Sequence, residues 1–261
     1  MRRGLGVCPG TLWRHVFNVP KAKAPETAMS NEEIIRRRNL PHWDVPTAAY
    51  FVTVCLEGSI PARGLLDLQS YRAELEQRPR PAYQTPAEWA IVQWKRAFAR
   101  TDLWLDRAEA VRFLEIDELA QIVVDALYFF AGERYDLLGY VVMPNHLHWV
   151  FQPLEQWVNG LKPGKRPRTP RERIVHTIDR FTALRCNQVL GRQGGFWQRE
   201  PYDHWVRGPE ELERILLYVE GNPVKAGLVE SPHEWRHSSA WERHRGGLEL
   251  GQPLTRPKPE S

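Results

Sequence analysis

The fold is decided by two strand-like runs around a turn signal, in the stretch YDLLGYVVMPNHLHWVFQ at residues 135–152. On both sides of Pro144-Asn145 the sequence is rich in β-branched and aromatic residues, which favour strands. Proline presets its backbone angle and asparagine tolerates tight turns, so the dipeptide is typical of a chain reversal. The stretch is therefore predicted to form an antiparallel β-hairpin.

The segments on either side of this hairpin complete an α+β pattern. The run AYFVTVCL at 49–56 predicts a buried strand, and the apolar spacing over 109–131 predicts an amphipathic helix. After the hairpin, the sequence predicts a helix over 173–190, a strand over 196–206 and a helix over 210–220. This order of elements is typical of helices packed on a single antiparallel sheet.

Proline-rich and weakly periodic segments set the predicted domain limits. Residues 63–108 are charged and interrupted by prolines, which predicts an insertion of two short helices after the first strand. Residues 1–40 lack periodicity and are predicted to be a poorly ordered leader. Residues 241–261 are predicted to be a flexible tail, which leaves 41–240 as the folded domain.

The bulk composition excludes several classes of protein. The chain has 261 residues, of which 42% are hydrophobic and 26% charged, as in ordinary globular proteins. The three cysteines form neither a disulfide framework nor a C-x-x-C zinc motif, and no apolar run reaches the ~18 residues of a membrane span. The net charge of +4 mildly favours an anionic partner. We expect a soluble intracellular protein, whether translation begins at Met1 or at Met29.

His146 and His148 are the first candidate site residues. Side chains two apart on a strand point to the same face, so both imidazoles can bind one divalent ion. Leu147, Trp149 and Phe151 fall on the opposite face and are predicted to pack into the core. Two strand histidines that bind nothing would give the same pattern, so the pair alone leaves both interpretations open.

Tyr218 is the second candidate, on the predicted helix over 210–220. The apolar stripe of this helix consists of Leu212, Ile215, Leu216 and Val219. Tyr218 lies roughly 110° from the centre of that stripe, so it is predicted to flank the core. Asn222, one turn later, lies near the same flank. The helix is predicted to stop at Gly221 and Pro223, because the residue before a proline disfavours α geometry. A boundary tyrosine and a helix-closing asparagine are the alternative interpretation.

A cluster of basic residues follows the hairpin, between residues 160 and 173. It contains one acidic residue, Glu172, and six basic ones: Lys162, Lys165, Arg166, Arg168, Arg171 and Arg173. Such a cluster neutralises phosphates, and nearby aromatic side chains can stack on unpaired bases. A solvated flexible loop would have the same composition.

Taken together, these motifs resemble the REP-associated tyrosine transposases, which are single-tyrosine HUH transposases. VMPNHLH at 142–148 resembles the metal-binding strand of that family. FWQREPYDHWVR at 196–207 resembles the strand before the nucleophile helix, and LYVEGNPVKAGL at 217–228 resembles the catalytic segment. RRNLPHW at 37–43 and YFVT at 50–53 add to the similarity, and all motifs come in the family's order.

The resemblance implies a ferredoxin-like α+β fold: an antiparallel sheet with helices on one face, here with the helical insertion after the first strand. It implies that His146 and His148 lie on a central strand and hold a divalent ion, Mg²⁺ or Mn²⁺. Tyr218 would be the nucleophile that attacks a DNA phosphodiester, and Asn222 takes the position of a third ligand.

The resemblance also implies single-stranded DNA as the partner, in the form of hairpins from repeated extragenic palindromes. Cleavage would leave a 5′-phosphotyrosine and a free 3′-hydroxyl, and full transposition would require a homodimer or successive turns. The expected place is the bacterial cytoplasm, at the nucleoid. Relatives usually carry a lysine where Asp179 stands, and Arg180 is expected to replace it. The residues expected to contact DNA are Lys162, Lys165, Arg166, Arg168, Arg180 and Lys225.

Two other classes of function stay open at this point. A domesticated protein would keep the fold and bind hairpin DNA without cleaving it. An unrelated metal hydrolase would use the histidine pair on small substrates, but it would leave the motifs around Tyr218 unexplained.

Overall fold

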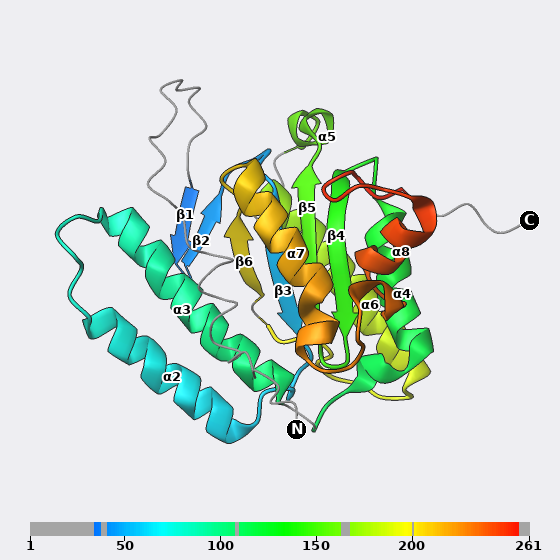
Figure 1. Ribbon diagram of the computed structural model, residues 1–261, viewed down its shortest axis with the longest axis horizontal. Coiled ribbons are helices and arrows are strands. Elements are labelled where there is room, and N and C mark those ends of the chain that lie inside the picture. The colour runs from blue at the N-terminus through cyan, green and yellow to red at the C-terminus, as the bar shows by residue number, and fades with distance from the viewer. Residues whose placement is uncertain (1–33, 38–40, 108–109, 163–167, 200, 256–261) are drawn as a thin grey trace, which may run out of the picture.

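The computed structural model describes residues 34–37, 41–107, 110–162, 168–199 and 201–255 (Figure 1). Its centre is a four-stranded antiparallel sheet with the strand order β4-β5-β3-β6. The strands are β3 (Tyr50–Cys55), β4 (Tyr135–Met143), β5 (His146–Pro153) and β6 (Tyr202–Trp205). None of the helices in these ranges is both long enough and apolar enough to cross a membrane.

The predicted hairpin is confirmed as β4 and β5. Met143 pairs with His146 across the Pro144-Asn145 turn, and β5 pairs on its other side with β3. The histidine strand is therefore central, with neighbours that satisfy its backbone on both sides. Cys55 lies opposite His146 and Thr53 lies opposite His148.

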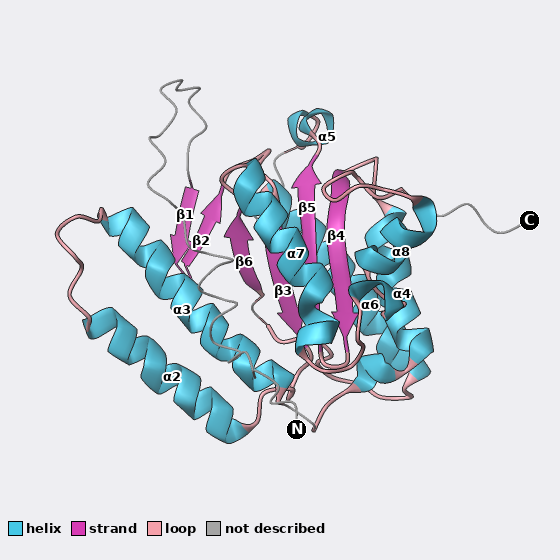
Figure 2. Cartoon of the chain, viewed as in Figure 1, coloured by secondary structure: helices cyan, strands magenta, loops and turns pink. Residues whose placement is uncertain are grey.

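Helices cover both faces of this sheet (Figure 2). The helices α4 (Asp117–Phe129) and α6 (Pro170–Val189) lie on one face, and α3 (Pro86–Asp106) and α7 (Pro209–Lys225) lie on the other. The chain order β3-α4-β4-β5-α6-β6, combined with the strand order, gives the predicted ferredoxin-like topology. The sequence predicted helices on one face of the sheet, and α4 and α6 lie there. The helices α3 and α7 are additional and lie on the opposite face.

Each face of the sheet has its own hydrophobic core, because strand side chains alternate between faces. Leu147, Trp149 and Phe151 of β5 pack under α4 and α6, as predicted, and all are almost fully buried. Val150 lies in the other core, with residues of α3 and α7. His146 and His148 share the parity of Val150, so they belong to the α3–α7 side.

The predicted helical insertion is confirmed, but its two helices are longer than expected. They are α2 (Ala62–Gln77), with 16 residues, and α3, with 21 residues. Pro79 and Pro81 lie between the helices and interrupt neither one. Pro86 is the first residue of α3, where proline costs no hydrogen bond, and a Thr85–Glu88 capping box fixes that start.

The helix α7 corrects the prediction that Gly221 and Pro223 end it, since it continues to Lys225. Pro223 lacks the N–H that would bond to the helix, a defect of about 3 kcal/mol in an isolated helix. Packing outweighs the defect, because Val219 and Asn222 are fully buried against the sheet. The last turn also keeps the bond from the Ala226 N–H to the Asn222 carbonyl, at 2.9 Å.

Two other boundaries differ from the prediction. The predicted strand over 196–206 is regular only in β6, and Trp197 forms an isolated bridge with Leu56. The helix α6 begins at Pro170 rather than Arg173, because a Thr169–Glu172 capping box fixes its first turn.

The segments outside the predicted domain also contain ordered structure. Most of the predicted leader lies outside the described residues, but β1 (Ile34–Arg37), within it, pairs with β2 (Pro41–Asp44). In the predicted flexible tail, α8 (Ser239–Gly246) and the buried Leu254 pack on the domain. The remaining short elements are α5 (Glu155–Asn159), η1 (Phe113–Glu115) and η2 (Pro232–Glu234).

Close packing of α7 on β4 predicts a strong effect of one added methyl group. A Cβ atom on Gly139 would lie 2.5 Å from Cδ2 of Leu216, which is fully buried, so the leucine side chain or the helix would have to shift. Gly139→Ala is therefore expected to lower the free energy of unfolding by about 1–3 kcal/mol in urea denaturation.

The matched control is Gly221→Ala in α7, where an added Cβ meets nothing within 4 Å. That change should raise the stability by about 0.5–1 kcal/mol, because alanine favours helix over glycine. Equal stabilities of the two variants would contradict the packing of α7 on Gly139.

Candidate active site and metal centre

His146 and His148 face each other in the interior of the protein. Both side chains are fully buried on β5, and their Nε2 atoms are 3.1 Å apart. Two imidazole nitrogens at this distance require a proton or a cation between them, because two lone pairs repel each other. The pair therefore has the convergent geometry that the sequence predicted.

Neighbouring side chains fix the orientation of each imidazole through its other nitrogen. The Asn145 Nδ2 group donates to the Leu105 carbonyl at 2.8 Å, so its Oδ1 atom faces His146 Nδ1 at 2.6 Å. His146 must then carry its proton on Nδ1, which leaves the Nε2 lone pair for a ligand. His148 Nδ1 lies 2.7 Å from the Thr53 hydroxyl, which leaves its Nε2 atom facing the same point.

Tyr218 reaches this point from α7. Its Oη atom lies 3.2 Å from His148 Nε2 and donates to Asp102 Oδ1 at 2.7 Å. The ring packs edge-on against Phe51, and only 3% of the residue is exposed. The sequence placed Tyr218 at the flank of the core. It is buried because α3 covers that flank.

Asp102 is the site residue that sequence reasoning missed. It lies on α3, is fully buried, and offers a carboxylate oxygen within 4.8 Å of the ligand nitrogens of both histidines. Its signal in the sequence is an acidic residue inside an apolar helical stripe, formed by Trp94, Phe98 and Leu105. A charge at such a position is rarely buried without a partner.

Lys225 is the partner of Asp102. Its ammonium group donates to Asp102 Oδ2, and it lies 2.8 Å from Asp106 Oδ2. The sequence predicted Lys225 as a DNA contact, but the structure places it in an internal ion-pair cluster with 9% of its side chain exposed. The lysine thus links the last turn of α7 to the last turn of α3.

Asn222 lies one helical turn after Tyr218 and is fully buried. Neither Oδ1 nor Nδ2 of its amide has a partner at hydrogen-bonding geometry among the described residues. The amide nevertheless lies close enough to the Tyr218 phenol to oppose the rise in its pKa. An unsatisfied buried amide costs about 1–3 kcal/mol, which a ligand with suitable polar atoms would recover.

Burial sets the charge state of the site. It lowers the pKa of His146 and His148, so both imidazoles are neutral, as metal ligands must be. Burial and the nearby Asp102 charge raise the pKa of Tyr218 well above its usual value. Burial opposes ionisation of Asp102, but His148 and the Lys225 charge outweigh it and hold that pKa well below its ordinary range. The phenol therefore needs added positive charge to ionise.

Apart from Lys225, the described basic residues that were predicted to contact DNA lie outside the site. Lys162 and Arg168 are exposed at the two ends of the basic loop, while Lys165 and Arg166 fall outside the described residues. Arg180 is exposed on α6. Lys162, Arg168 and Arg180 are thus on the α6 side of the sheet, away from Tyr218 and the two histidines.

Comparison with known proteins supports the motif resemblance. A protein of Haemophilus influenzae, described as a putative REP-associated tyrosine transposase, is 28% identical over 113 residues, or 40% of this chain and 58% of that protein. The chain is similar to a REP-associated tyrosine transposase. An uncharacterized protein of the same organism is 30% identical over 106 residues, covering 37% of this chain and 57% of that protein.

The likeness to these two proteins is partial. The chain matches a little under three fifths of the length of each curated relative. A solved structure of a REP-associated tyrosine transposase bound to a REP hairpin aligns with 16% identity and a TM-score of 0.44, over 85% of this chain and 93% of that one. The chain matches no model of a known protein family.

Proposed function

We propose that the protein is a divalent-metal-dependent endonuclease and strand transferase that acts on single-stranded DNA at or near REP-type hairpins. The observation that carries this proposal is the 3.2 Å distance between the Tyr218 hydroxyl and His148 Nε2, inside a buried cluster that also contains His146. A purely structural tyrosine does not require a convergent pair of buried imidazoles. The similarity to a putative REP-associated tyrosine transposase supports the choice of substrate.

The residues present fit a divalent cation. Asp102 offers a carboxylate oxygen, and His146 and His148 offer Nε2 atoms whose opposite ring nitrogens are already engaged. Carboxylate oxygen suits Mg²⁺ and Mn²⁺, and imidazole favours the transition metal, so the mixed set fits Mn²⁺ best. Asn222 has a buried carbonyl oxygen that forms no hydrogen bond with the described residues, and this oxygen can complete the set. A cation there supplies positive charge that lowers the phenol pKa and neutralises the phosphate.

The protein residues then carry out one balanced exchange of bonds. The Tyr218 oxygen forms a bond to phosphorus, and its proton passes to Asp102 Oδ1, which already accepts its hydrogen bond at 2.7 Å. The bond from phosphorus to the 3′-oxygen breaks, and that oxygen takes up the proton that Asp102 received and leaves as a hydroxyl. The product is a 5′-phosphotyrosine, which conserves the energy of the phosphodiester. Attack by a second 3′-hydroxyl reverses the step and joins strands.

A covalent-adduct assay tests this function. Incubation of the protein with a 5′- and 3′-labelled hairpin oligonucleotide and Mn²⁺ should give a species of the combined mass on a denaturing gel. The adduct should retain the label on the 3′ side of the cut only. Tight hairpin binding without any adduct would instead identify a DNA-binding protein that does not cleave.

Asp102 is expected to contribute to metal binding, which Asp102→Asn tests. The change keeps the shape of the side chain but removes the charge beside both histidines. The Kd for Mn²⁺, measured as the metal-dependent rise of the melting temperature, should increase by about 10–100-fold.

The matched control is Asp106→Asn on the same helix. Asp106 contacts Lys225, as Asp102 does, but it is not among the groups that lie close to both histidines. Its variant should keep the Mn²⁺ affinity within about threefold of the parent. Equal losses in both variants would place the effect in the Lys225 ion pairs rather than at the metal.

A further inference from the structure

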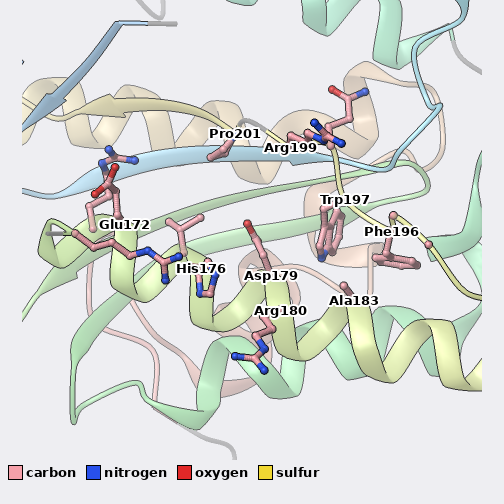
Figure 3. A pocket seen from close by; sticks show the side chains of 15 residues that line it. Glu172, His176, Asp179, Arg180, Ala183, Phe196, Trp197, Arg199 and Pro201 are labelled. Atoms are coloured by element: carbon pink, nitrogen blue, oxygen red, sulfur yellow. The ribbon is translucent and has the colours of Figure 1, made fainter. Parts of the chain in front are cut away.

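A second cavity lies on the α6 side of the sheet, whereas Tyr218 and the histidines lie on the α7 side. It is bounded by α6, by residues 194–199 and by Pro201, and its volume is about 410 Å³ (Figure 3). Sites for small ligands typically have volumes of about 300–1,000 Å³. The cavity is therefore large enough for one nucleotide unit, and the catalytic site does not account for it.

The floor of this cavity carries a carboxyl group without a protein partner. Asp179 points from α6 towards the facing segment, beside Trp197 (Figure 3). Its carboxyl forms no hydrogen bond or ion pair with any described residue, and burial raises its pKa to about 8. A ligand that brings N–H donors would stabilise the ionised carboxylate in this position. Hydrogen bonds from such donors replace those that the carboxylate loses when it is removed from water.

The rim of the cavity has the opposite charge. Arg168, Arg180 and Arg199 are exposed there, and no acidic side chain among the described residues pairs with them. Exposed guanidinium groups bind phosphate oxygens readily. A simple anion would satisfy the rim but would bring no N–H donor to Asp179, and a simple cation would be repelled by the rim.

The wall of the cavity is apolar and partly aromatic. It is formed by Val175, Ala183, Phe196 and Trp197. The Trp197 indole donates to the Thr182 hydroxyl at 2.8 Å, which fixes the ring at the edge of the cavity. A flat heterocycle can pack against such a wall while its edge reaches Asp179.

We propose that this cavity binds one unpaired guanine of a DNA strand, with the N1–H and 2-amino groups donating to Asp179 and the adjoining phosphates at the rim arginines. Guanine is the base that presents two N–H donors side by side on its pairing edge. Adenine presents one donor beside one acceptor, cytosine presents one donor beside two acceptors, and thymine presents one donor between two acceptors. The choice of DNA as ligand rests on the proposed function, but the cavity is separate from the cleavage chemistry.

Binding of single-stranded oligonucleotides to the Tyr218→Phe variant tests the proposal without cleavage. Oligothymidines carrying one central guanine, inosine or adenine serve as probes in fluorescence anisotropy, and inosine differs from guanine only by lacking the 2-amino group. The guanine probe should bind about tenfold more tightly than the inosine or adenine probe. Asp179→Asn should reduce this preference to about twofold or less, because its amide nitrogen presents a donor where guanine needs an acceptor.

Two controls separate base recognition from general electrostatics. Asp125→Asn, an exposed acidic residue on α4 outside the cavity, should keep the full guanine preference. Arg199→Ala should weaken all three probes by a similar factor, because phosphate contacts carry no base specificity.

Three outcomes would overturn the proposal: equal binding of the three probes, an unchanged preference after Asp179→Asn, or no binding of any probe. A guanine preference without a covalent adduct would refute the proposed cleavage but leave this site standing. An adduct without a guanine preference would support the proposed cleavage and refute the guanine site.

Discussion

Replacing Tyr218 with phenylalanine is expected to abolish the covalent protein–DNA adduct, with a loss of at least about a thousandfold. The variant removes only the oxygen that lies 3.2 Å from His148 Nε2 and 2.7 Å from Asp102 Oδ1. The ring and its edge-on contact with Phe51 remain, so the α3–α7 core keeps its packing. Denaturing gels of the parent and the variant, each with labelled hairpin and Mn²⁺, measure the effect.

The matched control is Tyr202→Phe on β6. Tyr202 is also buried and hydrogen bonded, in its case to Arg72 and Thr101, but it has no contact with either metal-site histidine. This variant should lose about 1 kcal/mol of stability and still form the adduct. A full-strength adduct from Tyr218→Phe would refute the assignment of the nucleophile, whatever the control shows.

Loss of one histidine is expected to have the next largest effect, because in the proposed mechanism it removes both the metal site and the chemistry that depends on it. The parent, stripped with a chelator, should melt about 5–10 °C higher when Mn²⁺ is added at a hundred times its Kd. His148→Ala should show no such rise and no adduct at any practical Mn²⁺ concentration. Differential scanning fluorimetry with and without metal gives the first result, and the adduct gel gives the second.

His204→Ala is the control for the loss of a buried imidazole. His204 lies on β6, bonded to Glu211 at 3.0 Å, and it does not belong to the metal cluster. Its variant should melt at a lower temperature than the parent but keep the full rise with Mn²⁺. An undiminished response to Mn²⁺ in His148→Ala would contradict the metal site on β5.

Local patterns were sufficient to predict most of the fold. The alternation around Pro144-Asn145 predicted β4 and β5 closely, because a two-residue period and a turn signal are encoded within the segment itself. The periodicities of α4 and α6 were likewise local. The prediction that α7 ends near Gly221 was wrong because the packing that outweighs the Pro223 defect comes from the sheet, which is distant in sequence.

The site was predictable only in part, for the same reason. His146, His148 and Tyr218 belong to sequence motifs, and their convergence is what those motifs imply. Asp102 belongs to none, and its distance to the histidines depends on how α3 lies across the sheet. The helical periodicity of α7 predicted that Tyr218 lies at the edge of the core. The structure buries it, because α3 covers this edge, and the sequence of α7 alone does not reveal a second helix.

The position of α3 has a consequence for when the protein can act. His146, His148, Asp102 and Asn222 are all without solvent exposure, so a phosphodiester cannot reach the Tyr218 oxygen while α3 stays in place. Displacement of α3 breaks the Lys225 ion pairs and exposes Phe98, and the free energy for this must come from contacts with the substrate. A DNA strand that binds weakly does not displace α3, so Tyr218 stays enclosed and protonated. In the proposed mechanism the protein therefore selects its cleavage site during binding, before any bond is broken. If the protein cleaves DNA as proposed, this enclosure would restrict cleavage to strands that bind tightly enough to displace α3.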